Sequence, residues 1–415
     1  MESLSKKQVE DFHDHGYVII HGVLCDEEID RIKSGVMRRI HQGNVIPRSQ
    51  SYPAPAITFT IDRDNVEDPD LAYIATHPGI IHAAETLLGS PAILSAFVCY
   101  LKTPGAKGTS GDYQGSHPTA HQDYKTYQHA GSSLNWLFAI TPLGDLDEKI
   151  GPLYVSPGSH KLSSIRKMGN GVHHVERAQA EKVAPLVNAN LRKGDLLLMH
   201  MFCWHEGGPN QANRDRIGIY NKFRAANAPP ACGPNLFNES AAKALTTNNR
   251  CLTPHHSDRH VTNTRLLIEH DSKYLMVRHR RGEDACQDSW ELPGGNLQPI
   301  DLKRPHDAGN VIHSLEQNVC EQTGIEVPWM TYIGDYAEGE TLCRIYAHPL
   351  TGKKPDMKCN TDERAEWFSA DQFKQFAKNR QLINGYELQV IDHWLDNSYL
   401  RGVGESKRRA LPGIT

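Results

Sequence analysis

The sequence predicts two domains, a jelly roll with helices packed outside it and a further domain beyond a linker. Its 415 residues exceed the length at which a single hydrophobic core keeps growing. Short apolar runs at 92–101, 134–141 and 153–155 alternate with turn residues, which is typical of an antiparallel jelly roll. Prolines among polar residues without periodicity mark 227–262 as the linker between the domains.

Two amphipathic helices are predicted near the start of the chain. Ser5, with Gln8 three residues later, indicates the start of the first helix, and Gly16 indicates its end. The second helix follows Asp26 and ends near Gly43. Its apolar residues recur at helical spacing, at Ile29, Ile32, Val36 and Ile40. We expect both helices to lie against the outside of the jelly roll.

His121, Asp123 and His205 form a candidate iron site. Residues two apart project to the same side of an extended strand, so His121 and Asp123 can reach one ion. The apolar run 194–199 predicts a buried strand that leads toward His205. Two imidazoles and one carboxylate occupy one face of a six-coordinate Fe(II) and leave three positions open, which indicates catalysis. His200, the nearest alternative to His205, is interpreted as a strand residue.

Several motifs in the same order resemble the phytanoyl-CoA dioxygenase family of Fe(II)/2-oxoglutarate oxygenases, over roughly residues 4 to 226. They are the helix and strand at 4–20, the turn-rich stretch 151–161, and the segment 205–210 followed by Arg216. The resemblance implies a double-stranded β-helix, with Fe(II) as cofactor and 2-oxoglutarate and O₂ as co-substrates. It also implies that His121, Asp123 and His205 hold the iron.

The same resemblance implies roles for three further residues. Arg216 would bind the distal carboxylate of 2-oxoglutarate by a planar two-point contact, which suits a guanidinium better than an ammonium. Trp136 and Lys102 match family residues near the same acid, with core packing for Trp136 and solvent exposure for Lys102 as the alternatives.

The carboxylate of Asp123 indicates the reaction type. Relatives that halogenate carry a small residue at this position, so the resemblance implies hydroxylation of an unactivated C–H bond, with release of succinate and CO₂. Polar residues around the iron motif favour a small polar metabolite as substrate, whereas an acyl-CoA would require a basic groove that residues 1–226 do not display. These polar residues are Tyr113, Gln114, Tyr124, Lys125, Tyr127, Gln128 and His129.

Roughly residues 262 to 396 resemble a Nudix domain, an α/β/α sandwich that normally binds Mg²⁺ and a nucleotide diphosphate. A hairpin around 270–273 and the stretch 290–295 precede a helix that ends at Gly324. Of the family's helix carboxylates only Glu321 remains, and an amide such as that of Gln322 is a poor Mg²⁺ ligand. We expect a domain without hydrolase activity that serves substrate recognition or forms a homodimer. The expected division is 1–250, 262–396 and a tail over 397–415.

Composition limits the location and partners of the protein. A net charge of −4 with interspersed signs argues against a nucleic-acid partner. Nine scattered cysteines without a CxxC motif favour a reducing compartment. Residues 1–7 lack the apolar core that a signal peptide has, and no apolar stretch approaches the length of a membrane span, so we expect a cytoplasmic protein without a membrane partner. The alternatives to an oxygenase are a Mg²⁺-dependent Nudix hydrolase and a catalytically silent binding or scaffold protein.

Overall fold

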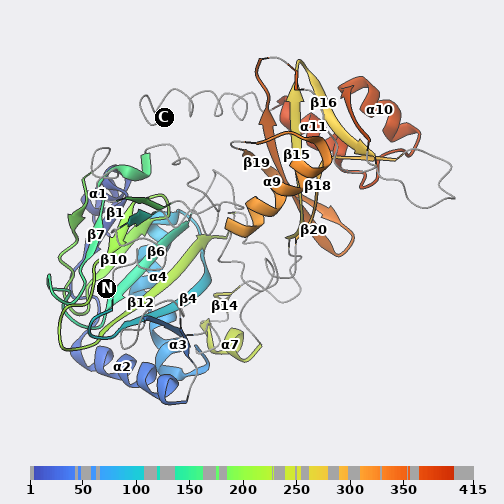
Figure 1. Ribbon diagram of the computed structural model, residues 1–415. Coiled ribbons are helices and arrows are strands. Elements are labelled where there is room, and N and C mark those ends of the chain that lie inside the picture. The colour runs from blue at the N-terminus through green and yellow to red at the C-terminus, as the bar shows by residue number, and fades with distance from the viewer. Residues whose placement is uncertain are drawn as a thin grey trace.

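The structure, a computed structural model, describes large parts of both halves of the chain (Figure 1). The described residues are 4–42, 45–47, 58–61, 66–106, 119–121, 136–161, 174–176, 185–226, 228, 239–247, 250–253, 261–278, 289–297, 309–327, 330–352, 354–355 and 364–396. No helix within these ranges is both long and apolar enough to cross a bilayer.

Two antiparallel sheets form the first domain, as the predicted jelly roll requires. One sheet has the order β1 (Tyr17–Ile20), β10 (Leu196–His200), β6 (Trp136–Pro142), β12 (Arg216–Ala225), β4 (Ala92–Lys102), β3 (Thr58–Ile61) and β2 (Val45–Pro47). The other has the order β8 (His174–Glu176), β5 (Thr119–His121), β11 (His205–Gly207), β7 (Leu153–Val155) and β9 (Val187–Asn188). The runs predicted at 92–101, 134–141 and 153–155 are the strands β4, β6 and β7.

Helices cover the outside of the larger sheet. They are α1 (Lys6–His15), α2 (Asp26–His41), α3 (Pro69–Ala75) and α4 (Pro78–Leu88), and a 3₁₀ turn, η4 (Ser159–Lys161), follows β7. The predicted start and end of α1 are confirmed, because Ser5 and Gln8 form a capping box and Gly16 has a φ of 81°. In α2 the predicted apolar residues Ile29, Ile32 and Val36 are buried.

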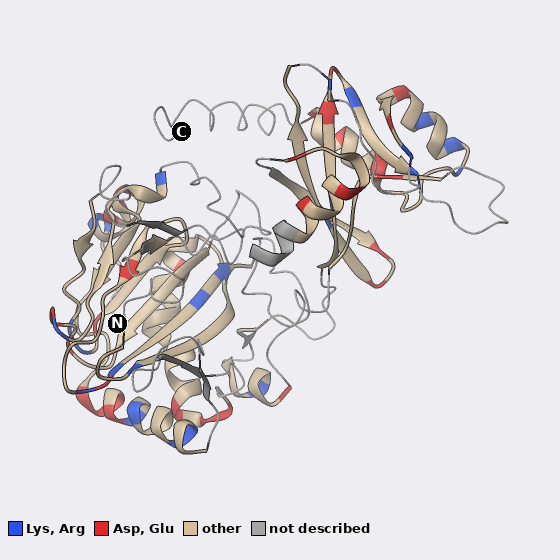
Figure 2. Ribbon diagram, in the orientation of Figure 1, with Lys and Arg blue, Asp and Glu red and all other residues tan. Residues whose placement is uncertain are grey.

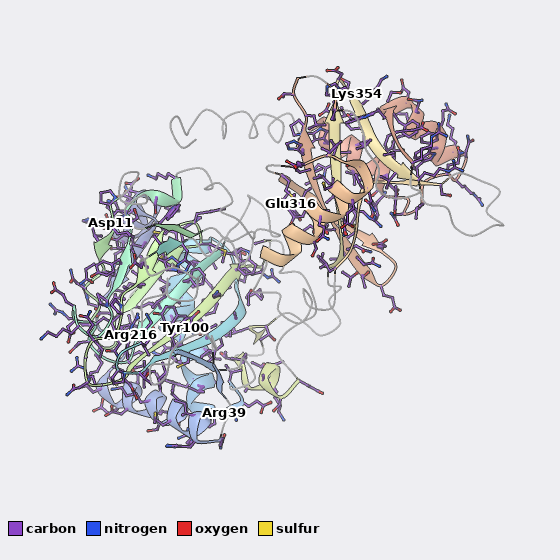
Figure 3. All side chains as sticks on the ribbon, in the orientation of Figure 1. Asp11, Arg39, Tyr100, Arg216, Glu316 and Lys354 are labelled. Atoms are coloured by element: carbon purple, nitrogen blue, oxygen red, sulfur yellow. The ribbon has the colours of Figure 1, made fainter. Side chains whose placement is uncertain are left out.

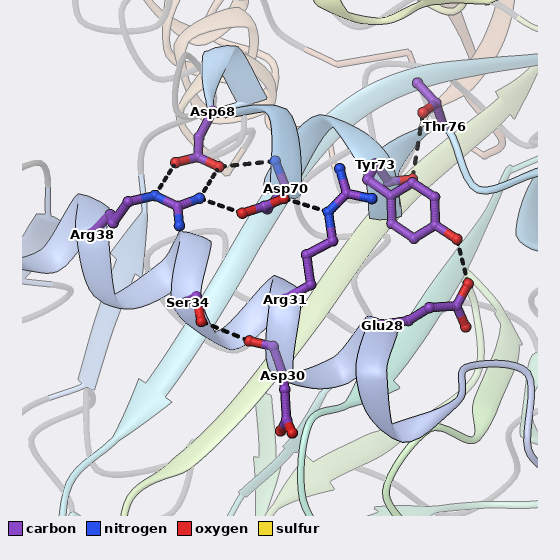
Figure 4. Close-up of polar contacts among 9 residues, drawn as sticks. All are labelled: Glu28, Asp30, Arg31, Ser34, Arg38, Asp68, Asp70, Tyr73 and Thr76. Atoms are coloured by element: carbon purple, nitrogen blue, oxygen red, sulfur yellow. Dashed lines mark hydrogen bonds and ion pairs between the residues drawn. The ribbon is translucent and has the colours of Figure 1, made fainter.

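Ion pairs connect α2 to α3 (Figure 4). Arg38 donates to both carboxylate oxygens of Asp68 over 3.0 and 2.9 Å. Arg31 pairs with Asp70, and Tyr73 donates to Glu28. Figure 2 shows that α2 has acidic residues in its first turn and basic residues in its last, an arrangement that the helix dipole favours.

The segment predicted as a linker is partly folded onto the first domain. It contains α7 (Glu239–Ala244), β13 (Thr246–Thr247) and β14 (Arg250–Cys251). Ala241, Leu245 and Leu252 belong to the core of the first domain, and Leu94 donates its amide to the Leu252 carbonyl over 2.6 Å. These few apolar residues were too widely spaced to reveal a periodic element, so the predicted linker was too long.

Three layers form the second domain. The central sheet has the order β17 (Trp290–Glu291), β16 (Lys273–Arg278), β15 (Val261–His270), β20 (Thr341–Pro349) and β19 (Thr331–Glu338), with β18 (Gly294–Asn296) on β15 and β21 (Arg364–Ser369) on β16. Its helices are α9 (Gly309–Thr323), α10 (Ala370–Lys378) and α11 (Glu387–Asp396). Leu315 and Val319 of α9 pack in one cluster, whereas Phe373 of α10 and Trp394 of α11 pack in another. The predicted hairpin is β15 and β16, with Asp271 and Ser272 in the left-handed turn.

A buried ion pair in this sheet leads to a stability prediction. Arg344, whose side chain is fully buried, donates to both oxygens of Asp335 over 2.7 and 2.6 Å. We expect Asp335→Ala to lower the free energy of unfolding by about 3 kcal/mol, because it leaves a buried guanidinium without this carboxylate. Urea unfolding of the full chain measures the change. The exposed Asp371–Lys374 pair provides the control: Asp371→Ala should change it by less than about 0.5 kcal/mol, and an equal effect of both substitutions would contradict the prediction.

Candidate functional site

Strands β5 and β11 bring two of the predicted iron ligands together. His121 is the last residue of β5, His205 is the first residue of β11, and the two lie directly opposite each other in the antiparallel pair. Their ring centroids are 4.3 Å apart, and both residues are buried. Two imidazoles this close, carried by paired strands, fit a single transition-metal ion.

The hydrogen bond of His205 also fits metal binding. Its Nδ1 lies 3.1 Å from the carbonyl oxygen of Cys203. A carbonyl only accepts, so Nδ1 carries the proton, and in the neutral ring Nε2 is then the unprotonated nitrogen that can bind a metal. A histidine oriented in this way by a backbone carbonyl is the usual form of a metal ligand.

The third predicted ligand, Asp123, lies outside the described residues, as do the polar residues 124–129. Within the part of the chain that the structure describes, no group of three His, Cys, Asp or Glu side chains could hold a metal. The expectation that Asp123 is the carboxylate ligand therefore still rests on the sequence alone, in which Asp123 follows His121 by two residues.

A turn predicted by the sequence holds the segment before His205 in place. Ser159 of η4 accepts a hydrogen bond from the Trp204 amide over 2.9 Å and donates to the Ser156 carbonyl over 2.6 Å. The Ser156 amide in turn donates to the Trp204 carbonyl over 2.9 Å. Cys203 is fully buried here, and burial raises the pKa of its thiol to about 12, so this cysteine stays protonated and packs as an apolar residue.

Glycines allow a close backbone approach just after β11. Gly208 donates its amide to the Pro152 carbonyl over 2.7 Å. Gly151 has a φ of 89°, and a Cβ added there would lie only 2.7 Å from the Gly208 carbonyl oxygen. The stretch 151–161 and the segment 205–210, which are separate in sequence, are therefore parts of one structural unit around His205.

Arg216 begins β12 on the face that looks toward the second sheet. The opposite face of β12 looks toward the helices, since Asn221 donates to the Ile74 carbonyl over 3.5 Å. Residues alternate along a strand, so Arg216 and Tyr220 share the inner face. The Arg216 guanidinium is buried and donates to the Tyr220 hydroxyl over 2.9 Å. A buried, oriented guanidinium suits the binding of a carboxylate.

The two weaker predictions fall at opposite ends of β12. Lys102 pairs with Arg216 in register, and its ammonium donates to the Gly208 carbonyl over 2.9 Å. Lys102 is buried, so the alternative of solvent exposure is wrong. Trp136 pairs with Arg224, roughly 26 Å along the strand from Arg216 at 3.3 Å per residue. The structure does not bring Trp136 to Arg216, and its ring belongs to the hydrophobic core.

The sequence did not reveal several residues of the inner face. Tyr100 and Tyr220 meet edge to face with centroids 4.7 Å apart, and Figure 3 shows Tyr100 near Arg216. Lys222 is buried with its ammonium 4.8 Å from the centroid of the Phe138 ring, which in turn lies 6.5 Å from the His205 ring. The alternation of β12 could have identified Tyr220 and Lys222, once Arg216 was assigned to the inner face.

His200, the rejected alternative ligand, lies at the end of β10 as predicted. It accepts a hydrogen bond from the Phe202 amide at Nδ1 over 3.1 Å and stacks on the Phe202 ring.

Burial, with the nearby His160 and His13, lowers the pKa of His200 to about 4. A folded pKa below the unfolded value of about 6.5 means that protons bind preferentially to the unfolded chain as the pH falls. The neutral imidazole therefore contributes stability above pH 6.5 that is lost between about pH 6.5 and 4.

We expect His200→Gln to make stability less dependent on pH in this window. Between pH 7.5 and 5, the wild-type protein should lose about 2 kcal/mol more free energy of unfolding than the variant, because glutamine does not titrate. Urea unfolding at the two pH values measures this difference. Parallel losses in both proteins would show that His200 does not titrate as its burial implies.

Comparisons with known proteins agree with this geometry. Residues 12–218 match the family model described as phytanoyl-CoA dioxygenase (PhyH). The ectoine dioxygenase of Bordetella bronchiseptica is 26% identical over 164 residues, which are 39% of this chain and 51% of that protein. The peroxisomal phytanoyl-CoA dioxygenase of Bos taurus is 24% identical over 246 residues, 54% of this chain and 69% of that protein. The chain thus spans about half the length of the first of these relatives.

Solved structures give similar matches. The non-heme alpha ketoglutarate dependent epimerase SnoN from nogalamycin biosynthesis has a TM-score of 0.43 and 21% identity, covering 61% of this chain and 96% of that one. EctD from S. alaskensis with 2-oxoglutarate and 5-hydroxyectoine has a TM-score of 0.43 and 16% identity, covering 54% and 77%. On the match of the family model, residues 12–218 of this chain belong to the phytanoyl-CoA dioxygenase (PhyH) family of Fe/2-oxoglutarate dioxygenases.

Proposed function

We propose that the first domain is an Fe(II)- and 2-oxoglutarate-dependent dioxygenase that hydroxylates an unactivated C–H bond. The observation that carries this proposal is the pair of buried histidines, His121 and His205, opposite each other on β5 and β11. Their spacing fits one metal ion, and the Cys203 carbonyl holds His205 in the tautomer that binds metal. Family membership of residues 12–218 supports the same assignment.

In this proposal each residue has a separate task. His121, Asp123 and His205 would hold Fe(II), which when bound would supply the oxidising chemistry that consumes 2-oxoglutarate and O₂ and releases succinate and CO₂. Arg216 binds the distal carboxylate of 2-oxoglutarate, and Tyr220 orients the guanidinium through its hydroxyl. The protein thereby fixes the co-substrate relative to the metal, and the remaining inner face orients the target C–H bond.

We propose a small polar metabolite as the substrate. The inner face of β12 and its neighbours presents Tyr100, Tyr220 and Lys222 beside Phe138, in addition to Lys102 and Arg216, so it is polar and positively charged next to an aromatic surface. The Bordetella relative is named for ectoine, whereas the bovine relative is named for phytanoyl-CoA. Both substrate classes therefore belong in the test.

Anaerobic titration followed by a substrate screen tests the proposal. Fe(II) and 2-oxoglutarate added without O₂ should give the visible charge-transfer band of the chelated cofactor. Oxygen and a panel of polar metabolites and acyl-CoAs should then give succinate and a product heavier by one oxygen atom. Absence of the band from folded protein would leave a binding or scaffold role, and product from acyl-CoAs alone would overturn the proposed substrate class.

For the second domain we propose a non-catalytic, Nudix-like module that serves substrate recognition or forms a homodimer. The mixed sheet, with β15 parallel to β20 and helices on both faces, supports the Nudix-like assignment. Gln322, at the position of a family carboxylate, exchanges two hydrogen bonds with the Gly294 backbone over 2.8 and 3.0 Å. Glu321 accepts from Gln317 over 2.8 Å. Mg²⁺-dependent nucleotide release that Glu321→Gln abolishes would restore the hydrolase alternative.

A further inference from the structure

Lys102 directs its ammonium toward the strand that carries His205. It is the last residue of β4 and is only 6% exposed. Its Nζ donates to the Gly208 carbonyl over 2.9 Å and lies 3.5 Å from the Gly207 carbonyl oxygen. Gly207 ends β11, which begins at His205. The positive charge of Lys102 therefore lies against the backbone carbonyls of Gly207 and Gly208, two and three residues after the proposed metal ligand His205.

The backbone of Lys102 is held by the same segment. Asn210 donates its side-chain amide to the Lys102 carbonyl over 2.9 Å and also to the Arg214 carbonyl over 2.9 Å. The Asn210 backbone exchanges two further hydrogen bonds with the residues after β4, to Gly105 and Ala106, both over 2.8 Å. The connection from His205 to Arg216 is thus fastened to the end of β4 by both side chains, Lys102 and Asn210.

The register adds Arg216 to this arrangement. Lys102 and Arg216 are directly opposite each other on β4 and β12, so their side chains leave the sheet on the same face, with Cβ atoms roughly 5 Å apart. Like charges in such a pair are unfavourable unless each has its own acceptors. The ammonium faces the carbonyls of Gly207 and Gly208, whereas the guanidinium faces the Tyr220 hydroxyl. The two cationic side chains therefore point toward different acceptors, and we expect them to have different roles.

We propose that Lys102 is a positioning residue that sets β11, and with it His205, relative to Arg216. This inference rests on the proposed iron site. It differs from a contact between Lys102 and 2-oxoglutarate, because the ammonium stabilises the backbone of the metal-binding strand. Its removal should consequently weaken the site before any 2-oxoglutarate is present.

Lys102→Met, which keeps the length of the side chain and removes the charge, tests this inference. In full-length protein under anaerobic conditions, Fe(II) alone should bind about tenfold more weakly than to wild type, the range found when groups that support metal ligands are removed. In the metal-free protein, hydrogen exchange should accelerate at the amides of Gly208 and Asn210. Unchanged Fe(II) affinity and exchange, with 2-oxoglutarate affinity alone reduced, would show a contact with the acid and overturn the inference.

Two further variants keep the outcome decisive. Lys102→Gln, which removes the charge but retains a hydrogen-bond donor, replaces Lys102→Met if the latter loses its cooperative unfolding transition. A lower Fe(II) affinity of this variant would support the inference, and a wild-type Fe(II) affinity would contradict it. Lys161→Met is the matched control, because this exposed lysine pairs with Asp14 and should leave Fe(II) affinity unchanged. Failure of the proposed function itself is distinguishable, since wild-type protein would then bind no Fe(II).

Discussion

His205→Ala is expected to abolish Fe(II) binding and with it all turnover of 2-oxoglutarate. The substitution removes one of two imidazoles that face each other across β5 and β11, and His121 with a single carboxylate is a weak chelator. We expect Fe(II) affinity to fall at least about 100-fold and kcat/KM at least about 1000-fold, because the reaction depends on the metal. Anaerobic Fe(II) titration and succinate production measure the two effects.

The control for this substitution is His82→Ala, which removes an exposed imidazole from α4. It should leave Fe(II) affinity and succinate production at wild-type values. Cooperative unfolding of both variants shows that the fold survives. Folded His205→Ala protein with wild-type Fe(II) affinity would place the metal elsewhere and remove the basis of the proposed function.

Arg216→Ala is expected to weaken 2-oxoglutarate binding while leaving Fe(II) binding intact. Two charged hydrogen bonds from this buried guanidinium to the distal carboxylate, as proposed, would contribute several kcal/mol to 2-oxoglutarate binding, so its KM should rise about 100-fold or more in the variant. Arg216→Lys keeps the charge but not the planar pair of donors and should retain part of the affinity. The charge-transfer band, titrated with 2-oxoglutarate at saturating Fe(II), reports both variants.

Arg214 provides a matched control two residues earlier. Its side chain is 58% exposed, and the guanidinium pairs with Asp147 over 3.0 Å at the surface. Arg214→Ala should change KM for 2-oxoglutarate by less than about twofold, as is usual for exposed ion pairs. Equal KM values for wild type and Arg216→Ala would exclude Arg216 as the anchor of the co-substrate.

The sequence predicted those features that residues close together along the chain determine, such as the start and end of a helix. The capping box of Ser5 and Gln8 and the left-handed Gly16 bound α1 as expected. The sequence also singled out His121 and His205, because metal ligands are restricted to few residue types and His205 has a distinctive turn after it. The structure places the two histidines opposite each other, and their role as metal ligands stays a prediction. Asp123 lies outside the described residues, so its place in the site is still a prediction.

Features that depend on strand register could not be predicted. The pairing of Lys102 with Arg216, and of Trp136 with Arg224, follows from how β4 and β6 align on β12, and a shift by one residue would reverse every side chain. The family resemblance implied a place for Trp136 near the co-substrate, with core packing as the alternative. The structure places Trp136 in the core, at the far end of β12 from Arg216.

The pairing of β5 with β11 has a consequence for how well the folded chain resists unfolding and proteolysis. His121 and His205 are 84 residues apart in sequence, so one ion bound by both would act as a cross-link that closes a long loop. A ligand that binds only the folded chain stabilises it by a free energy that rises with the logarithm of its concentration once this exceeds the dissociation constant. Iron supply would then influence how long the chain resists proteolysis, in addition to how fast it works.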